Sequence, residues 1–324
     1  MENTHKIDFN AIRTENNLRK SVLISDYDPI TGKGCYGKRK AVSIQEKTLY
    51  LPITMLNENH ISQYTPREDV ESIRIRYDFE FWCARCVTIK DKTSARNINF
   101  TLNAPQRRVL ALLEDMRTAG KPIRLIMLKA RQWGGSTLVQ IYMAWIQIIH
   151  CSHWNSLICG HLKDTSSAIK GIYSRLLKEY PKVLNECDAP MTFHPFEKSR
   201  NVSEITGRNC LVVTGSAESQ ESIRGFDIAM AHLTEVAFWR TTAQKSPENV
   251  VRAVCGSIAL LPTIVVRNRQ VLSIAFRYHL LVNDRSLFRA KPRKQDICHS
   301  VQLWRATIRY GSSYLRRWRY FPSL

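Results

Sequence analysis

KARQWGGST, residues 129–137, is the stretch that decides the fold of this chain of 324 residues. A short apolar run, IRLIML at 123–128, precedes it, and a longer one, LVQIYMAWIQII at 138–149, follows. The first run predicts a strand and the second a helix. A glycine pair followed by Ser-Thr at such a junction indicates a phosphate-binding loop, because glycines let backbone N–H groups approach an anion at a helix N-terminus.

The loop lacks the lysine that stands directly before the Ser or Thr of an ordinary phosphate-binding loop. When Gly134, Gly135 and Ser136 are aligned with the end of that motif, Ser136 takes the position of the Mg²⁺ ligand. Lys129 stands at the far end of the loop, from which an ammonium group can reach the same phosphates, and Arg131 adds a second cation. A glycine turn without any phosphate role is the structural alternative.

A second stretch, MAHLTEVAFW at 230–239, places an apolar strand directly before Thr234 and Glu235. Sites that hydrolyse phosphate esters use a carboxylate at such a strand end to orient or deprotonate the attacking water. Glu235 suits that role, and the hydroxyl of Thr234 stands where an aspartate would contact metal-bound water. A single glutamate at a strand end also occurs without a catalytic role.

The central region alternates between strand and helix patterns, which predicts an α/β fold with a mainly parallel sheet and helices on both faces. Pro105 suits the first turn of the helix expected at 103–120. The other expected helices are 138–150 and 163–181, and the expected strands are 123–128, 156–160, 210–215, 228–233 and 263–266.

KARQWGGST, AHLTEVAFW and the intervening SAESQESIRGFD (216–227) together resemble the ATPase domain of bacteriophage terminase large subunits. Those DNA-packaging motors tolerate Walker A loops with an early lysine and often carry Ser or Thr before the catalytic glutamate. The resemblance covers roughly residues 70–266. It implies a P-loop NTPase fold of the ASCE type that binds ATP and Mg²⁺.

The resemblance also implies a role for each matching residue. Glu235 would activate water, and Arg131 would act as an arginine finger supplied by the same chain. Ser136 would ligate Mg²⁺ directly, with Thr234 and Glu235 contacting the ion through water. The implied ATP-binding residues are Gln106, which would read the adenine, and Lys129, Arg131, Gln132, Gly134, Gly135, Ser136 and Thr137.

Two of these residues can also be explained without any role in a nucleotide site. Arg224, before Gly225, matches a possible sensor of the nucleotide, but a surface arginine beside a turn glycine gives the same pattern. For Gln106, the alternative is a solvated glutamine in the first turn of a helix, without a role in binding.

In the intact family, ATP hydrolysis drives DNA through a portal into a procapsid. The resemblance therefore implies three partners: double-stranded DNA, a portal protein and a small terminase subunit. It also implies a homo-oligomeric ring on the portal, without membrane contact, of a phage- or prophage-encoded protein in the host bacterial cytoplasm. The sequence agrees in having no signal-peptide pattern and no apolar run of about 18 residues.

Three parts are expected: an irregular N-terminal extension (1–65), the ATPase domain (66–266) and an irregular, arginine-rich tail (267–324). The tail holds eleven Arg, two Lys and two Asp, a net +11 of the total +20. Large terminases continue instead with a Glu-Ser-Thr-Ala coupling motif and an acidic nuclease domain. We therefore expect both to be missing and ATPase activity to be in doubt.

The tail can be explained by a frameshift. Degenerate codons for 267–270 permit Glu-Ser-Thr in the neighbouring reading frame, a hypothesis that the nucleotide sequence of the gene tests. The alternative is a real tail in which arginines contact phosphates and aromatic residues stack on bases.

Two other functions remain open at this point. A helicase-like nucleic-acid translocase would need an Asp-Glu pair at the second strand and a second such domain. A non-enzymatic DNA-binding protein would use the basic tail.

Cys83 and Cys86 form a lone CxxC pair among nine cysteines. A structural zinc site needs about four ligands. The alternative is a pair of buried reduced thiols.

Overall fold

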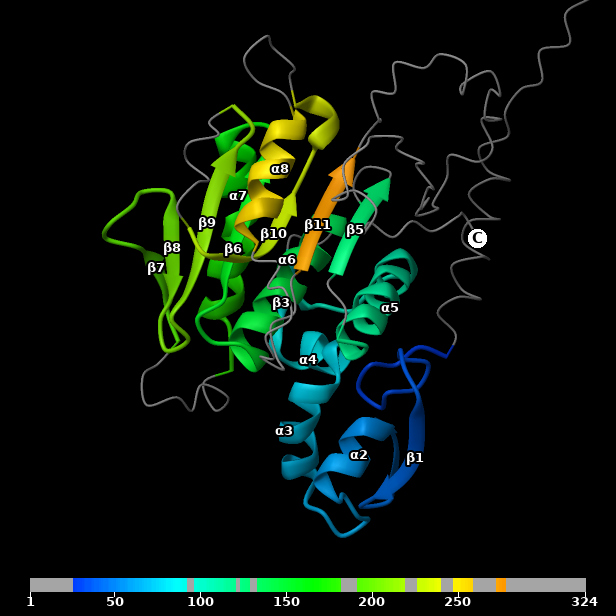
Figure 1. Cartoon of the computed structure of the whole chain (residues 1–324). Helices are drawn as coiled ribbons and strands as arrows, with labels where there is room; N and C mark the ends of the chain where they lie inside the picture. Colours follow the sequence, from blue (N-terminus) through cyan, green and yellow to red (C-terminus); the bar gives the residue numbers. More distant parts are fainter. Residues whose placement is uncertain are drawn as a thin grey trace, which may run out of the picture.

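The computed structural model describes residues 26–91, 96–120, 123–128, 133–181, 191–218, 226–239, 247–258 and 272–277, and they form a mixed α/β architecture (Figure 1). The N-terminal elements are β1 (Arg39–Ile44), β2 (Lys47–Pro52), α2 (Ile53–Asn59), α3 (Arg67–Tyr77), α4 (Phe79–Cys86), β3 (Thr88–Lys90) and β4 (Asn97–Asn99). The central elements are α5 (Ala104–Thr118), β5 (Ile123–Leu128), α6 (Gly135–Trp145), a π-helical turn (Ile146–His150), β6 (Asn155–Gly160) and α7 (Lys163–Lys178). The remaining elements are β7 (Phe193–Pro195), β8 (Val202–Ile205), β9 (Cys210–Ser216), β10 (Ile228–Leu233), a 3₁₀ turn (Val236–Phe238), α8 (Pro247–Ser257) and β11 (Leu272–Arg277).

A seven-stranded sheet organises the described chain, in the order β5-β11-β10-β6-β9-β8-β7. The first five strands of this order run parallel to one another, whereas β8 is antiparallel to both of its neighbours, β9 and β7. The prediction of a mainly parallel sheet is therefore confirmed for the strands that carry the two motifs. The antiparallel edge was not predicted.

Apolar side chains pack on both faces of the parallel strands. Leu157 and Cys159 of β6 lie in one core with Val250 and Val254 of α8, whereas Ile158 lies in the core that α6 and α7 share. Successive strand residues point to opposite faces, so a strand covered on both sides must be apolar almost throughout. The expected helices on both faces are thus present.

Most of the central elements lie within a few residues of their expected bounds. The helix after the glycine pair begins at Gly135, three residues earlier than expected, and its last turn is π-helical. The strand expected at 263–266 lies outside the described residues.

The N-terminal extension is not irregular, and that expectation is wrong for its described part. β1 and β2 pair as an antiparallel hairpin, and α2 follows directly. Gln45 and Glu46 form the turn, with φ of 47° and 65°. Two central residues with positive φ are the mark of a type I′ hairpin turn, which usually carries Asn-Gly. Because neither residue here is glycine or asparagine, the sequence concealed the turn.

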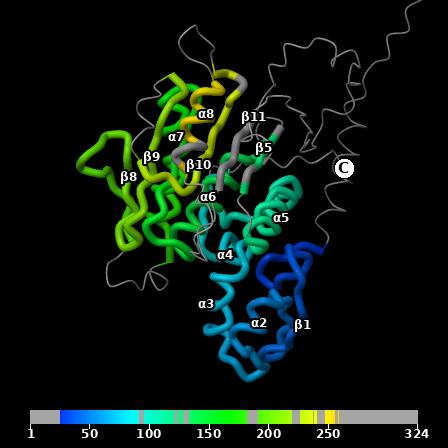
Figure 2. The backbone as a smooth tube through the Cα atoms, viewed as in Figure 1, coloured from blue at the N-terminus to red at the C-terminus, as the bar shows by residue number. Residues whose placement is uncertain are grey.

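This hairpin packs with α2 and α3 around a small apolar core. Leu51, Met55 and Val70 are fully buried in it. We call the described residues 26–77 the N-terminal module. Figure 2 shows its backbone grouped apart from the large sheet, with α4 and α5 between them.

Replacing the hairpin turn is expected to stabilise the module. Gln45→Asn combined with Glu46→Gly keeps the backbone conformation and supplies the residue types that tolerate positive φ, so the free energy of unfolding should rise by about 0.5–1 kcal/mol. Urea unfolding measures the change. Gln45→Ala combined with Glu46→Ala is the control, and an equal gain from the control contradicts the assignment of the turn.

Strand β11 corrects the expected irregular tail for six of its residues. Leu272–Arg277 pair in parallel with β5 on one side and with β10 on the other. Apolar residues alternate in LSIAFR, but the pattern is too short to count as a sustained period of two. The rest of 267–324 lies outside the described residues.

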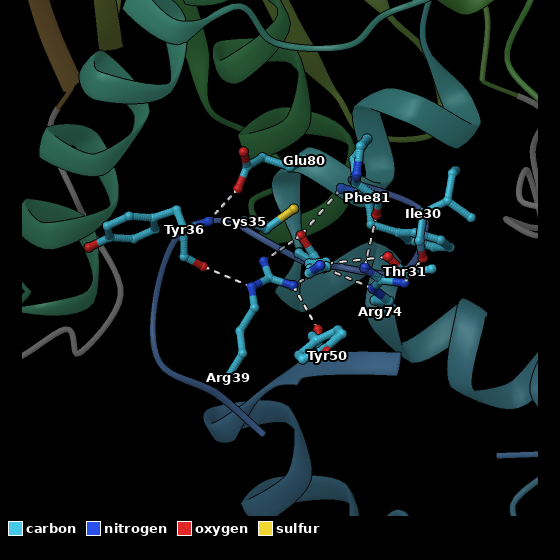
Figure 3. Close-up of polar contacts among 12 residues, drawn as sticks. Ile30, Thr31, Cys35, Tyr36, Arg39, Tyr50, Arg74, Glu80 and Phe81 are labelled. Carbon is cyan, nitrogen blue, oxygen red and sulfur yellow. Dashed lines mark hydrogen bonds and ion pairs between the residues drawn. The ribbon is translucent and has the colours of Figure 1, made fainter. Parts of the chain in front are cut away.

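A buried group of charges joins the N-terminal module to α4 (Figure 3). The carboxylate of Asp78 accepts hydrogen bonds from Arg39 Nη1 and Nη2, at 2.7 and 2.9 Å, and from Arg74 Nε at 2.8 Å. Arg39 also donates to the carbonyl of Tyr50. The side chains of Asp78 and Arg74 are both 1% exposed. The group therefore links a hairpin and two helices through one carboxylate.

Candidate functional site

The glycine turn lies between the end of β5 and the start of α6. Gly134 is the N-cap of α6 and has φ of 83° and ψ of 21°, a left-handed conformation that favours glycine. A Cβ at this position would lie 2.6 Å from Gln106 Nε2. Gly135, Ser136 and Thr137 form the first helical turn, whose N–H groups have no acceptor within a helix. The turn thus offers backbone donors and a hydroxyl, as a phosphate-binding loop requires.

Glu235 is the second residue after β10 and also has a left-handed backbone, with φ of 56°. This conformation is uncommon for residues other than glycine, and such strain concentrates at functional sites. The side chain of Glu235 is 44% exposed, whereas Thr234 is 2% exposed. The N–H of Thr234 donates to the carbonyl of Cys159 at 2.9 Å. Of this pair, Glu235 is the residue whose side chain is open to a ligand.

The glycine turn and Glu235 lie at the same edge of the sheet. β5 and β10 are parallel strands that flank β11, and both motifs follow the carboxyl ends of their strands. Figure 1 shows the arrows of these strands pointing the same way. Neighbouring strands lie about 4.8 Å apart, so the two strand ends are separated by about 10 Å.

His161 lies beside Glu235 and was not predicted. Its Nδ1 is 3.6 Å from Glu235 Oε2, and its ring centroid is 6.2 Å from that of Phe238. His161 is the first residue after β6 and Glu235 is the second residue after β10, and these strands are parallel neighbours. The signal was therefore available in the sequence, as a polar residue after an apolar strand.

A buried polar contact links the two motif-bearing elements behind this edge. Gln140 Nε2 of α6 lies 2.5 Å from His232 Nδ1 of β10, and both residues are fully buried. Gln140 stands one turn after Ser136, and His232 stands three residues before Glu235. A hydrogen bond in such a setting fixes the helix and the strand relative to each other. Sequence patterning alone does not reveal such a pair, because each residue sits in an otherwise apolar run.

Gln106 lies against the glycine turn. It is 3% exposed, and its Nε2 donates to the carbonyl of Gly134 at 3.0 Å. Its Oε1 accepts from the backbone N–H of Asn103 at 2.9 Å. The structure therefore brings Gln106 to the predicted site, with its amide bonded to the protein.

Four of the predicted residues lie outside the described chain: Lys129, Arg131, Gln132 and Arg224. Their roles stay predictions. The described residues hold the two ends of the expected site, namely the glycine turn with Ser136 and Thr137 and the strand end with Thr234 and Glu235.

Cys83 and Cys86 lie on α4, and both are buried, reduced thiols. Burial raises the pKa of Cys83 well above its ordinary value and raises that of Cys86 to about 12. Within the described ranges, no group of three or more His, Cys, Asp or Glu side chains is arranged to hold a metal ion. Both residues therefore belong to the hydrophobic core against which α4 packs.

None of the helices in the described part of the chain has the length and apolar character needed to cross a bilayer.

No protein-family model matches the chain, and no curated protein matches it. Among solved structures, the chain is similar to the ATPase domain of the large terminase of Thermus phage P74-26 and to an arginine-to-alanine mutant of that domain. Each is 14% identical, with a TM-score of 0.34, and the alignment covers 47% of this chain and 58% of the other. The chain thus spans less than two thirds of the length of these structures.

Proposed function

We propose that this chain is the ATPase part of a phage DNA-packaging motor of the large-terminase type. One observation carries the ATPase assignment: a left-handed glycine turn at a helix start and a solvent-open glutamate lie at the same edge of a parallel sheet. The terminase assignment rests on the combined sequence resemblance of the three stretches at 129–137, 216–227 and 230–239. The P-loop NTPase fold is part of the same proposal.

The residues divide the work of hydrolysis. Lys129 and Arg131 neutralise the phosphates, and the N–H groups at the start of α6 bind their oxygens. Mg²⁺, when bound to the Ser136 hydroxyl, supplies positive charge to the transferring phosphoryl group. Glu235 holds and polarises the attacking water, and Thr234 supports the same water network.

The remaining predicted residues complete the nucleotide site. Gln132 and Thr137 flank the bound phosphates within the loop, and Arg224 senses their presence. Gln106 was expected to read the adenine.

The proposed partners are double-stranded DNA, a portal protein and a small terminase subunit. The chain would act in a homo-oligomeric ring on the portal, in the cytoplasm of the host bacterium. Because the coupling motif is expected to be missing, ATP binding is the first property to measure, and ATP hydrolysis follows.

Nucleotide binding to wild type and Lys129→Ala tests the proposal. A charged hydrogen bond to phosphate contributes about 1.5–3 kcal/mol, so Lys129→Ala should weaken ATP binding about 10- to 100-fold in calorimetric titrations with Mg²⁺. Lys178→Ala, an exposed lysine at the end of α7, is the matched control and should bind like wild type.

Equal affinity of wild type and Lys129→Ala removes the proposed role of this lysine. Wild-type protein that binds DNA but no nucleotide overturns the ATPase assignment. That result would favour the DNA-binding alternative, which deletion of 267–324 would then test.

A further inference from the structure

Two side chains at the start of α5, the N-cap Asn103 and Gln106 of the first turn, bond to consecutive carbonyl groups of the glycine turn. Asn103 Nδ2 donates to the carbonyl of Trp133 at 3.0 Å, and Gln106 Nε2 donates to the carbonyl of Gly134 at 3.0 Å. These bonds connect segments that are separated in sequence by β5 and the whole loop. The glycine turn is therefore anchored on a helix that precedes its own strand.

The same two side chains close the capping box of α5. Asn103 Oδ1 accepts from the backbone N–H of Gln106 at 3.0 Å, and Gln106 Oε1 accepts from the backbone N–H of Asn103 at 2.9 Å. Each amide thus uses its oxygen on the helix and its nitrogen on the loop. Rotating either amide by half a turn would break both of its bonds, so the cap fixes the direction of each donor.

Anchoring these carbonyls helps to fix where the loop N–H groups point. The carbonyl of Gly134 is also held by α6, because it accepts from the N–H of Leu138 at 3.0 Å, so Asn103 is the side chain that holds the carbonyl of Trp133. In a planar trans peptide the C=O and the N–H of the same unit point in opposite directions. With the carbonyls of Trp133 and Gly134 held toward α5, the N–H groups of Gly134 and Gly135 point away from it. A left-handed residue followed by a helical one also turns successive N–H groups to one side, which makes a concave anion site. Gly134 and Gly135 have this sequence of conformations.

The first turn of α5 is itself held by the N-terminal module and α4. Arg107 Nε lies 3.3 Å from Glu80 Oε1, and the Arg107 guanidinium lies 3.8 Å above the ring centre of Tyr27. Arg107 also donates to the carbonyl of Gly34. Glu80 in turn accepts from the N–H of Tyr36 at 2.7 Å, and both residues are labelled in Figure 3. These contacts hold the start of α5, and with it the capping box, against the N-terminal module and α4.

We propose that Asn103, together with Gln106, is a positioning residue that orients the N–H groups of the glycine turn toward a triphosphate. This inference rests on the proposed function of the loop. It changes the role expected for Gln106, because its amide oxygen and one amide hydrogen are bonded to the protein rather than to an adenine. Loss of either donor should therefore weaken the binding of any triphosphate, whatever its base.

Asn103→Ser separates the positioning role from helix capping. Serine caps a helix about as well as asparagine, but it lacks the amide donor that reaches Trp133. Titrations with ATP, GTP and inorganic tripolyphosphate, each with Mg²⁺, should show all three affinities reduced by the same factor, about five- to tenfold. The thermal midpoint should stay at the wild-type value. Gln106→Glu keeps the acceptor of the capping box but replaces the donor to Gly134 by a charged oxygen, so it should give a larger loss that is also independent of the base.

Arg108→Ala is the matched control, since Arg108 is exposed on the same helix, and it should bind all three ligands like wild type. Wild-type affinity of Asn103→Ser for all three ligands overturns the inference while leaving the proposed function intact. A loss confined to ATP in Gln106→Glu shows that this side chain reads the base instead. Failure of wild type to bind any of the three removes the proposed function and the inference together.

Discussion

Glu235→Gln is expected to stop ATP hydrolysis while leaving ATP binding in place. The substitution keeps the size and the left-handed backbone of the residue but removes the carboxylate that would orient or deprotonate water. General-base catalysis contributes about 10²- to 10⁴-fold to a rate, so kcat should fall by that factor. Phosphate release measures kcat, and calorimetric titration with ATP and Mg²⁺ measures binding.

Glu248→Gln is the matched control for this experiment. Glu248 is an exposed carboxylate in the first turn of α8, and its loss should change neither quantity. Because glutamine suffers the same cost of positive φ as glutamate, Glu235→Gln should also unfold at the wild-type temperature. Turnover retained in Glu235→Gln would contradict the role of this carboxylate, and weakened binding alone would indicate a metal ligand rather than a base.

The second large effect is expected for Asp78→Ala. This change leaves the guanidinium groups of Arg39 and Arg74, which are 9% and 1% exposed, without the carboxylate between them. Removing one partner of a buried charge pair costs about 3–5 kcal/mol, because the remaining charge stays buried. Urea unfolding should show a loss of this size in the free energy of unfolding.

A surface pair in the same module provides the comparison. Arg67 Nε lies 3.1 Å from Glu71 Oε1, with side chains 37% and 24% exposed. Such pairs contribute at most about 1 kcal/mol, so Arg67→Ala should be nearly neutral. Equal losses in Arg67→Ala and Asp78→Ala would show that the buried group has no special weight.

The pH dependence of stability gives an independent check on Asp78. Burial by itself raises the pKa of Asp78, but the hydrogen bonds and charges of Arg39 and Arg74 outweigh burial and hold the pKa below its ordinary value. The folded state therefore favours the ionised form. This stabilisation is present above a pH of about 4, the ordinary aspartate pKa, and is lost as the pH falls from there toward the folded-state pKa.

Asp78→Asn should remove the part of the stability loss at acid pH that comes from protonation of Asp78. Glu80 works in the opposite direction, because burial raises its pKa and the folded state binds its proton more tightly. The charge of Asp78 also raises the pKa of Glu80, so the difference between wild type and Asp78→Asn reports Asp78 together with its effect on Glu80. If the free energy of unfolding of Asp78→Asn falls at acid pH as steeply as that of wild type, Asp78 does not stabilise the fold in its ionised form.

Long or fully buried elements were predictable from sequence. The strands 123–128 and 228–233 occur at their expected bounds, because a strand buried on both faces is an apolar run with clear ends. Short edge strands and the hairpin turn were missed. β7 and β8 have three and four residues, too few to show a period, and the turn at 45–46 uses residues without the usual signature.

The chemistry of the candidate site divides in the same way. Glycines, hydroxyls and a glutamate next to strand ends are recognisable by residue type, so the sequence predicts Gly134, Ser136 and Glu235 as site residues. His161 was overlooked although it follows an apolar strand in the sequence. The contact of Asn103 with Trp133 could not be predicted, because only the folded chain brings these residues together.

The sequence by itself determined the alternation of strands and helices and the two motifs at their junctions, since hydrophobic periodicity and glycine conformation are local properties. Tertiary structure alone decided the order of strands in the sheet, which places the ends of β5 and β10 at one edge. It also decided that the amides of Asn103 and Gln106 hold the carbonyls of the glycine turn. Contacts of this kind join residues far apart along the chain, so their partners are set by packing and not by the pattern around either residue.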